Sequence, residues 1–174
     1  MIDCFTADLD QTGIIEMKST FELTGGSFVS TDSFGNPVFK ESFKKFFDLD
    51  SKGELKMGFL AQTQVFLSKD VKISGAIGQC IPIVDPKNNQ YVSGTVIGNG
   101  GTNHWYLGGI DPTKSLAIYF DVDSTVEEKK NKNIHIQFHT KYQHVNGQMR
   151  LRVTTVEKNM AVHEDINSIA KGFD

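Results

Sequence analysis

One short stretch of the sequence has the residue types that open a calcium-binding loop. Residues 48–53 (DLDSKG) follow a predicted helix and place carboxylates at the first and third loop positions, with glycine at the sixth. The fifth position is Lys52, where an oxygen ligand is needed, and the twelfth is Phe59, where a bidentate glutamate closes such a site. We therefore predict a polar turn that binds no Ca²⁺.

Two further sets of potential metal ligands have a simpler explanation. Asp121 and Asp123 share one face of a predicted strand end, but aspartate is equally typical of a strand that runs into a turn. His135 and His139 share one face of another predicted strand. At about 3.3 Å per residue their positions are roughly 13 Å apart, too far for one zinc ion. We predict no metal-binding residues in this chain.

A glycine-rich stretch and the remaining polar residues give no sign of catalysis. Residues 98–102 (GNGGT) have the composition of a phosphate-binding loop, but such a loop should open a helix, and Trp105 and its neighbours indicate a strand. The sequence shows no recognisable Ser/His/Asp or Cys/His catalytic set, so we predict no catalytic and no cofactor-binding residues. An enzyme whose site is assembled only in space remains an alternative.

Composition bounds the class of protein. The 174 residues are 39% hydrophobic and 22% charged, as in an ordinary globular protein, and the net charge of −3 disfavours nucleic acid as a partner. No apolar run approaches the roughly 20 residues that span a bilayer, and the N-terminus lacks the features of a signal peptide. Cys4 and Cys80 sit in apolar contexts and are predicted to be free thiols in a reducing cytosol.

The first fifty residues have the pattern of an α/β unit. The predicted elements are, in order, a strand at 2–7, a helix at about 13–23, a strand at 27–30 and a helix starting at Asn36 and Pro37. The second helix is amphipathic, with phenylalanines gathered on one side at 39, 43, 46 and 47. Two strands and two helices leave sheet edges without partners, so we expect further strands upstream of this chain.

After residue 53 the pattern changes to short strands separated by turn residues. The predicted strands are 55–67, 71–81, 104–107, 116–122, 134–142 and 149–156, and a closing helix is predicted at about 161–170. Asn146 and Gly147 supply the turn between the last two strands. In that pair Ile134, Ile136 and Phe138 alternate with polar residues, and residues 151, 153 and 155 continue the alternation. Strands at this spacing predict an antiparallel sandwich.

Several of these stretches together resemble one family. They are 9–13 (LDQTG), 16–17, 23–26 (LTGG), 32–34, 39–40, 43–44, 72–78 (KISGAIG), 97–102, 105, 116–120 (LAIYF), 137–138, 142–144 (YQH), 147–148, 150–155 and 167–174. In this order they are similar to the Sec-twenty-three (Sec23) family, the Sar-GTPase-activating subunits of the COPII inner coat. The resemblance spans nearly the whole chain.

The resemblance implies a domain organisation that agrees with the pattern of elements. Residues 1–50 would be the end of a von Willebrand A-like trunk domain, 51–160 most of a mainly antiparallel β-sandwich, and 161–174 the first helix of a helical domain. The family's zinc finger and its gelsolin-like domain, which carries the catalytic arginine finger, would lie outside this chain. The resemblance therefore gives neither Arg150 nor Arg152 a catalytic role and implies no zinc here.

The resemblance also implies partners and a location. The parent subunit would bind a Sar-type GTPase, a cargo-adaptor subunit and an outer-coat subunit, and it would be cytoplasmic and peripheral on endoplasmic reticulum membranes and COPII vesicles. This chain would contribute structural and interaction surface and would not itself be an enzyme. The alternative function is a stand-alone carbohydrate- or calcium-binding sandwich. The missing loop glutamate and the presence of only one aromatic cluster that looks exposed, Trp105 with Tyr106, disfavour it.

Overall fold

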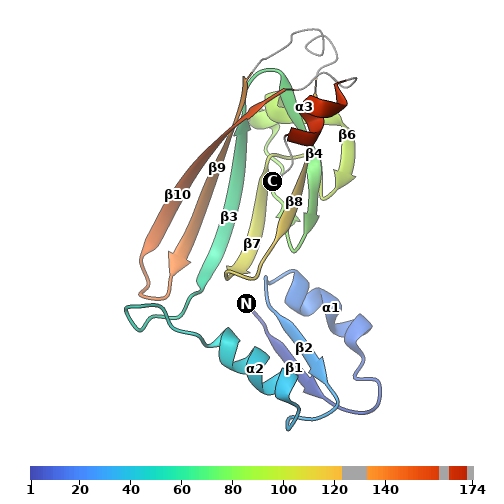
Figure 1. The fold of residues 1–174 in the computed structure, drawn as a ribbon, viewed down its shortest axis with the longest axis vertical. Coiled ribbons are helices and arrows are strands. Elements are labelled where there is room, and N and C mark those ends of the chain that lie inside the picture. Colours follow the sequence, from blue (N-terminus) through green and yellow to red (C-terminus); the bar gives the residue numbers. More distant parts are fainter. Residues whose placement is uncertain (123–132, 161–164, 172–174) are drawn as a thin grey trace.

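The computed structural model describes residues 1–122, 133–160 and 165–171. Two parts are evident in Figure 1. An α/β unit, formed by β1 to α2, lies at one end of a taller β-sandwich formed by β3 to β10. Within the described part of the chain, no helix is long and apolar enough to cross a membrane.

The α/β unit begins with two parallel strands joined by a helix. β1 (Cys4–Ala7) pairs with β2 (Phe28–Thr31), with Cys4 opposite Phe28. The connecting helix α1 (Ile14–Glu22) buries Phe21, whose ring stacks on that of Phe28 at a centroid distance of 5.3 Å. These elements confirm the predicted strand–helix–strand order.

The second helix of the unit, α2 (Pro37–Phe46), is fixed at its start and along one face. The Asn36 side chain accepts a hydrogen bond from the Val38 N–H at 2.8 Å, as predicted for an N-cap residue. Phe5 of β1 makes edge-on ring contacts with phenylalanines at 39, 43 and 46. Phe39 is buried, whereas Phe43 and Phe47 are 41% and 46% exposed. The amphipathic face is therefore only partly covered by the described residues.

The sandwich consists of two sheets of unequal size. The five-stranded sheet has the order β10-β9-β3-β7-β5 and the three-stranded sheet the order β6-β4-β8. The strands are β3 (Gly58–Leu67), β4 (Val71–Gly78), β5 (Ile81–Pro82), β6 (Val92–Gly98), β7 (His104–Ile110), β8 (Leu116–Val122), β9 (Asn133–His144) and β10 (Met149–Asn159). All pairings between these strands are antiparallel except that of β4 with β6. The predicted, mainly antiparallel sandwich is confirmed.

The core lies between the two sheets and is centred on Trp105. Its ring is fully buried in a cluster with Val65, Ile73, Ala76, Cys80 and Ile136. The indole N–H donates to the Asn99 carbonyl at 2.8 Å, so the only polar atom of this side chain is satisfied. The idea of Trp105 as an exposed aromatic residue is wrong: its whole ring faces the core.

The glycine-rich stretch before Trp105 is part of this core packing. It joins β6 to β7, as the prediction of a strand connection requires. A Cβ on Gly100 would overlap the Ser74 carbonyl of β4, the strand beside β6 in the three-stranded sheet, so the connection packs on that strand at backbone distance. The Asn103 side chain is almost fully buried. Its amide donates to the Val65 carbonyl of β3 at 2.9 Å and holds the end of the connection against that strand.

Strand boundaries differ from the predictions where glycine redirects the chain. The strand predicted for 71–81 ends at Gly78, whose φ is +143°, and the short β5 then joins the other sheet. The sequence analysis missed a 3₁₀ helix, η1 (Pro86–Tyr91), and β6. Of the predicted closing helix, residues 161–164 lie outside the described residues, and α3 (Ile166–Lys171) follows.

The last hairpin is formed as predicted. Apolar residues of β9 face the core, whereas Leu151 and Val153 of β10 face away from it. On β9, Ile136 is buried, and Ile134 and Phe138 contact the core. On β10, Leu151 and Val153 pair with Lys141 and His139, so they lie on the outer face and are 63% and 51% exposed. Both cysteines are free thiols, as predicted.

The α/β unit meets the sandwich through glycines. Gly25 and Gly108 have φ of +69° and +70°, which L side chains rarely adopt. A Cβ on Gly25 would overlap the Leu107 carbonyl, and one on Gly108 would overlap the Thr24 carbonyl. The Gly109 N–H donates to that same Thr24 carbonyl at 3.0 Å. The two parts are thus joined directly, backbone to backbone.

We predict that Gly25→Ala and Gly108→Ala each lower the free energy of unfolding by about 3 kcal/mol or more, because each adds backbone overlap to an unfavourable φ. Gly94→Ala is the matched control, since nothing lies within 4 Å of its added Cβ. Urea denaturation of the three variants measures the difference. Equal stability of Gly25→Ala and Gly94→Ala would contradict the proposed tight junction.

Candidate functional site

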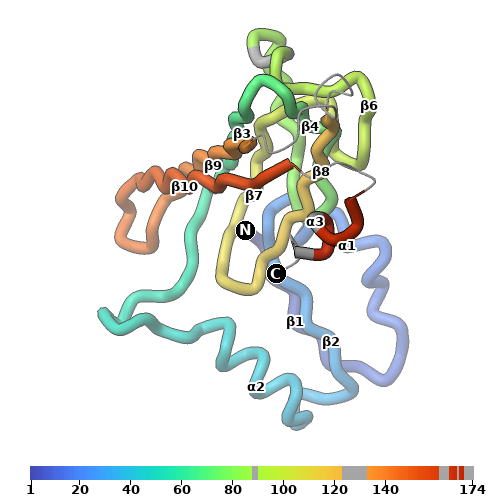
Figure 2. Tube along the Cα trace, turned by 45° about the horizontal axis from the view of Figure 1, so that its top comes forward, coloured from blue at the N-terminus to red at the C-terminus, as the bar shows by residue number. Residues whose placement is uncertain are grey.

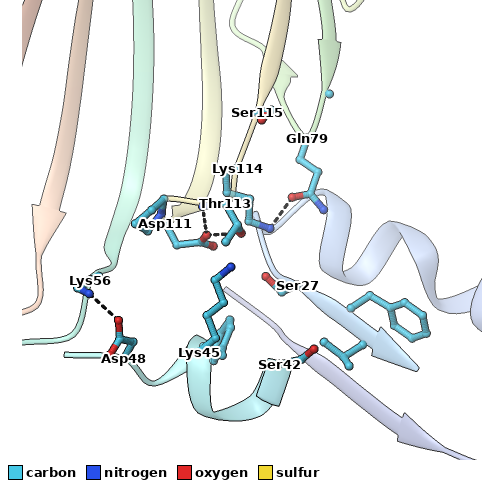
Figure 3. Close-up of a pocket in the computed structure, with 15 residues that line it drawn as sticks. Ser27, Ser42, Lys45, Asp48, Lys56, Gln79, Asp111, Thr113, Lys114 and Ser115 are labelled. Atoms are coloured by element: carbon cyan, nitrogen blue, oxygen red, sulfur yellow. Dashed lines mark hydrogen bonds and ion pairs between the residues drawn. The ribbon is translucent and has the colours of Figure 1, made fainter. Parts of the chain in front are cut away.

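A cavity of about 710 Å³ lies where the α/β unit meets the sandwich, and we call it the seam pocket (Figure 3). Four segments form its walls: β2, the C-terminal half of α2 with the residues after it, the end of β4, and the loop between β7 and β8. The lining residues are Ser27, Phe28, Val29, Ser42, Lys45, Phe46, Asp48, Lys56, Gly78, Gln79, Asp111, Pro112, Thr113, Lys114 and Ser115.

Lys114 is the most constrained charged group of the seam pocket. Its ammonium donates to the Gly26 carbonyl and to the Gln79 side-chain oxygen, both at 2.6 Å, and the Gln79 amide donates to the same carbonyl. Burial lowers the pKa of Lys114, and the nearby carboxylates of Asp111 and Asp3 oppose that shift. Lys114 thus links the sandwich loop to the end of α1 across the seam.

The two carboxylates of the seam pocket are already engaged. Asp48 accepts from the Lys56 ammonium at 2.5 Å, and this hydrogen bond is the main reason why the pKa of Asp48 is lowered. Asp111 accepts from the backbone N–H of Thr113 at 2.7 Å and from its hydroxyl. Neither carboxylate forms an ion pair within 4.0 Å with Lys45 or Lys114 in the described part of the chain.

The described lining of the seam pocket offers positive charge and hydrogen-bond donors. Among the residues that the structure describes, the lining includes hydroxyl and ammonium groups but neither histidine nor cysteine. The described lining therefore provides cationic and hydroxyl donors beside apolar side chains that include Val29, Phe46 and Pro112.

A second groove, of about 630 Å³, runs along the inner side of the hairpin β9–β10. Arg150 and Arg152 pair with Tyr142 and Thr140 and line this groove with them. At the groove's end, His144 faces Glu54 at 3.7 Å. Nothing among the described contacts gives either arginine a catalytic partner.

The stretch that resembles a calcium loop is a self-contained turn. Asp50 accepts hydrogen bonds from the backbone N–H groups of Lys52 and Glu54 at 2.8 and 3.0 Å, which are the main reasons why its pKa is lowered. Asp48 is engaged by Lys56. The carboxylates that would hold Ca²⁺ are thus used within the turn itself.

The other candidate ligands are also dispersed. Asp121 accepts from the Ser93 hydroxyl at 2.5 Å, while Asp123 lies outside the described residues. His139 contacts the Phe66 ring and the Gln137 side chain. Among the residues that the structure describes, no three His, Cys, Asp or Glu side chains gather in a way that could hold a metal ion.

The sequence analysis missed the residues of the seam pocket. Lys45, Gln79 and Lys114 come from three separate segments, and none lies in a recognisable motif. Two of the family-like stretches end at the pocket: 23–26 (LTGG) ends at Gly26, whose carbonyl binds Lys114, and 72–78 (KISGAIG) ends at the lining residue Gly78.

The fold and its comparisons with known proteins define the class. The architecture is that of a two-sheet β-sandwich with an attached α/β unit. The family model of the Sec23/Sec24 beta-sandwich domain matches residues 58–161, more than half of the chain. The chain therefore belongs to the Sec23/Sec24 β-sandwich family.

A solved structure shares the fold. The human COPII-coat protein Sec24c matches with a TM-score of 0.62 and 19% sequence identity over 92% of this chain. The chain covers 18% of the length of that protein. Because the match extends beyond the sandwich residues 58–161, the α/β unit is part of the shared fold as well.

We predict that calorimetric titration with Ca²⁺ or Zn²⁺ detects no stoichiometric site tighter than about 10 μM, the range of sensor loops. The reason is that the backbone N–H of Lys52 already binds the Asp50 carboxylate and the Lys56 ammonium already binds that of Asp48. Phe59→Glu supplies the missing twelfth-position ligand and serves as a comparison. Tight binding of Ca²⁺ by the unaltered chain would contradict this account of the turn.

Proposed function

We propose that this chain is a structural and interaction part of a COPII coat subunit that acts in transport from the endoplasmic reticulum to the Golgi. Membership of the Sec23/Sec24 β-sandwich family supports the coat role. The structural match to a human COPII-coat protein agrees with it. In this role the protein is cytoplasmic and peripheral on endoplasmic reticulum membranes and coated vesicles.

We assign the parent subunit more closely to the Sar-GTPase-activating branch of the family, on the motifs that the sequence shares with it. Its partners in this proposal are a Sar-type GTPase, a cargo-adaptor subunit and an outer-coat subunit. The chain divides into the end of a von Willebrand A-like trunk at 1–50, a sandwich at 51–160 and the start of a helical domain at 161–174. The arginine finger lies in another domain of the subunit.

The observation that carries a scaffold role is the glycine junction. A coat subunit must hold its interaction surfaces at fixed relative positions, and such a function needs rigid contacts rather than reactive groups. Gly25 and Gly108 bring the α/β unit and the sandwich into backbone contact, and Lys114 adds a polar link beside them. This chain requires no cofactor and is not an enzyme in this proposal.

We predict that the chain alone leaves GTP hydrolysis by a Sar-type GTPase unchanged within about twofold. An arginine finger supplies roughly 10³–10⁵ in rate, and in our proposal it is outside this chain. Phosphate release under single-turnover conditions is the measurement. Acceleration of a hundredfold, lost in Arg150→Ala or Arg152→Ala, would instead place the catalytic group in the second groove.

The coat role itself is tested with the complete subunit. The subunit should sediment with liposomes that carry the Sar-type GTPase loaded with a GTP analogue, and far less with the GDP-loaded form. Equal sedimentation with both forms would contradict the proposal.

A further inference from the structure

The size and the charge of the seam pocket go beyond what a purely structural joint between two parts of a fold needs. It is about 710 Å³ in volume, within the usual size range of small-ligand sites. Three lysines and two aspartates line it, so its net charge is positive. Figure 3 shows the amines of Lys45 and Lys114 and the hydroxyl of Ser27 around one common space.

The positive charge of the Lys114 ammonium is only partly balanced by the groups around it. Two of its three N–H groups donate to neutral oxygens, those of Gly26 and Gln79. No carboxylate lies within ion-pair distance of it in the described part of the chain, although Asp111 and Asp3 act on it electrostatically from farther away. A partly desolvated cation with one N–H still available favours an anionic neighbour.

Lys45 supplies the second cation from the opposite wall. It lies in the last turn of α2, and in the described part of the chain it forms neither an ion pair nor a hydrogen bond through its side chain. The remaining charged lining residues do not compete for a ligand, because Asp48 pairs with Lys56 and Asp111 is bound by Thr113. Lys114 therefore keeps one N–H for a ligand and Lys45 keeps all three. Neither ammonium has a carboxylate within ion-pair distance in the described part of the chain.

We propose that the seam pocket binds a phosphomonoester, with Lys45 and Lys114 facing the phosphate and the apolar side chains of the lining contacting the organic group. Two ammonium groups match the charge of about −1.5 to −2 that a phosphomonoester carries at pH 7. The hydroxyls of Ser27, Ser42 and Ser115 line the same pocket and can donate to its several oxygens. A carboxylate offers one charge and two oxygens and would use fewer of these groups.

The phosphate could belong to a free organic phosphate or to a phosphorylated serine of a peptide, and the site chemistry is the same for both. Val29, Phe46 and Pro112 would contact an aromatic or aliphatic group next to the phosphate. The inference does not depend on the coat assignment, because it rests on the pocket alone.

The test is calorimetry on the full chain with two probes. Phenyl phosphate represents the free compound, and a short phosphoserine peptide with apolar flanking residues represents the second source. We expect saturable binding of at least one probe, weakened about tenfold or more by Lys45→Gln, which removes a charge-assisted contact. Lys40→Gln is the matched control, because Lys40 is an exposed lysine of the same helix that lies outside the pocket lining.

The pH dependence separates phosphate from carboxylate recognition. The second ionisation of a phosphomonoester occurs near pH 6, so affinity should rise between pH 5.5 and 7.5. Benzoate and the unphosphorylated peptide serve as comparison ligands. Replacing Lys114 would also remove its link between the two parts of the fold. Ser27→Ala removes a hydroxyl of the pocket and leaves this link in place, so it provides a second variant.

Binding of phenyl phosphate alone would assign the site to a free compound, and binding of the peptide alone would assign it to a phosphorylated partner. Either result supports the proposal. It is overturned if neither probe binds, if Lys45→Gln binds as tightly as the unaltered chain, or if benzoate matches phenyl phosphate at pH 7.5.

Discussion

The contact on which the rest of the structure depends is the one between the turn after α1 and the end of β7. Thr24 and Gly25 lie against Gly108 and Gly109 so closely that no side chain fits between them. The distance is set by backbone atoms, whose positions cannot adjust as side-chain rotamers can. The α/β unit therefore has a fixed position at the base of the sandwich in Figure 1, and the view of Figure 2 shows the same arrangement. The seam pocket is the space that remains beside this contact.

The unequal sheets explain why polar side chains occupy part of the inner face of the larger sheet. The three-stranded sheet covers β3, β7 and the N-terminal part of β9, where Val65, Trp105 and Ile136 form the core. Towards the hairpin turn the inner side of β9–β10 borders a groove, and Arg150 and Arg152 lie on it. Charged side chains keep their hydration there, which the core would deny them. Leu151 and Val153 of β10 face outward instead.

The order of elements could be predicted from the sequence because helices and antiparallel strands have local patterns. Asn36 and Pro37 marked the start of α2, and the alternation around Ile136 marked β9. The strand β6 was missed because Gly94 interrupts its pattern and its parallel neighbour β4 is distant in sequence. The burial of Trp105 was missed for a related reason, since it depends on a second sheet. The seam pocket could not be predicted, because four separate segments contribute to it.

The 23–26 stretch shows how a family motif can arise from packing rather than from catalysis. Gly26 has no room for a side chain, because a Cβ would overlap the Ile2 backbone. Its carbonyl accepts hydrogen bonds from both Lys114 and Gln79, so one peptide group receives donors from two loops of the sandwich. Two donors on one carbonyl fix its direction as well as its distance. The Lys114 ammonium at the pocket is therefore held by Gly26, the residue that follows Gly25 of the junction. A group that binds there would contact both parts at their junction.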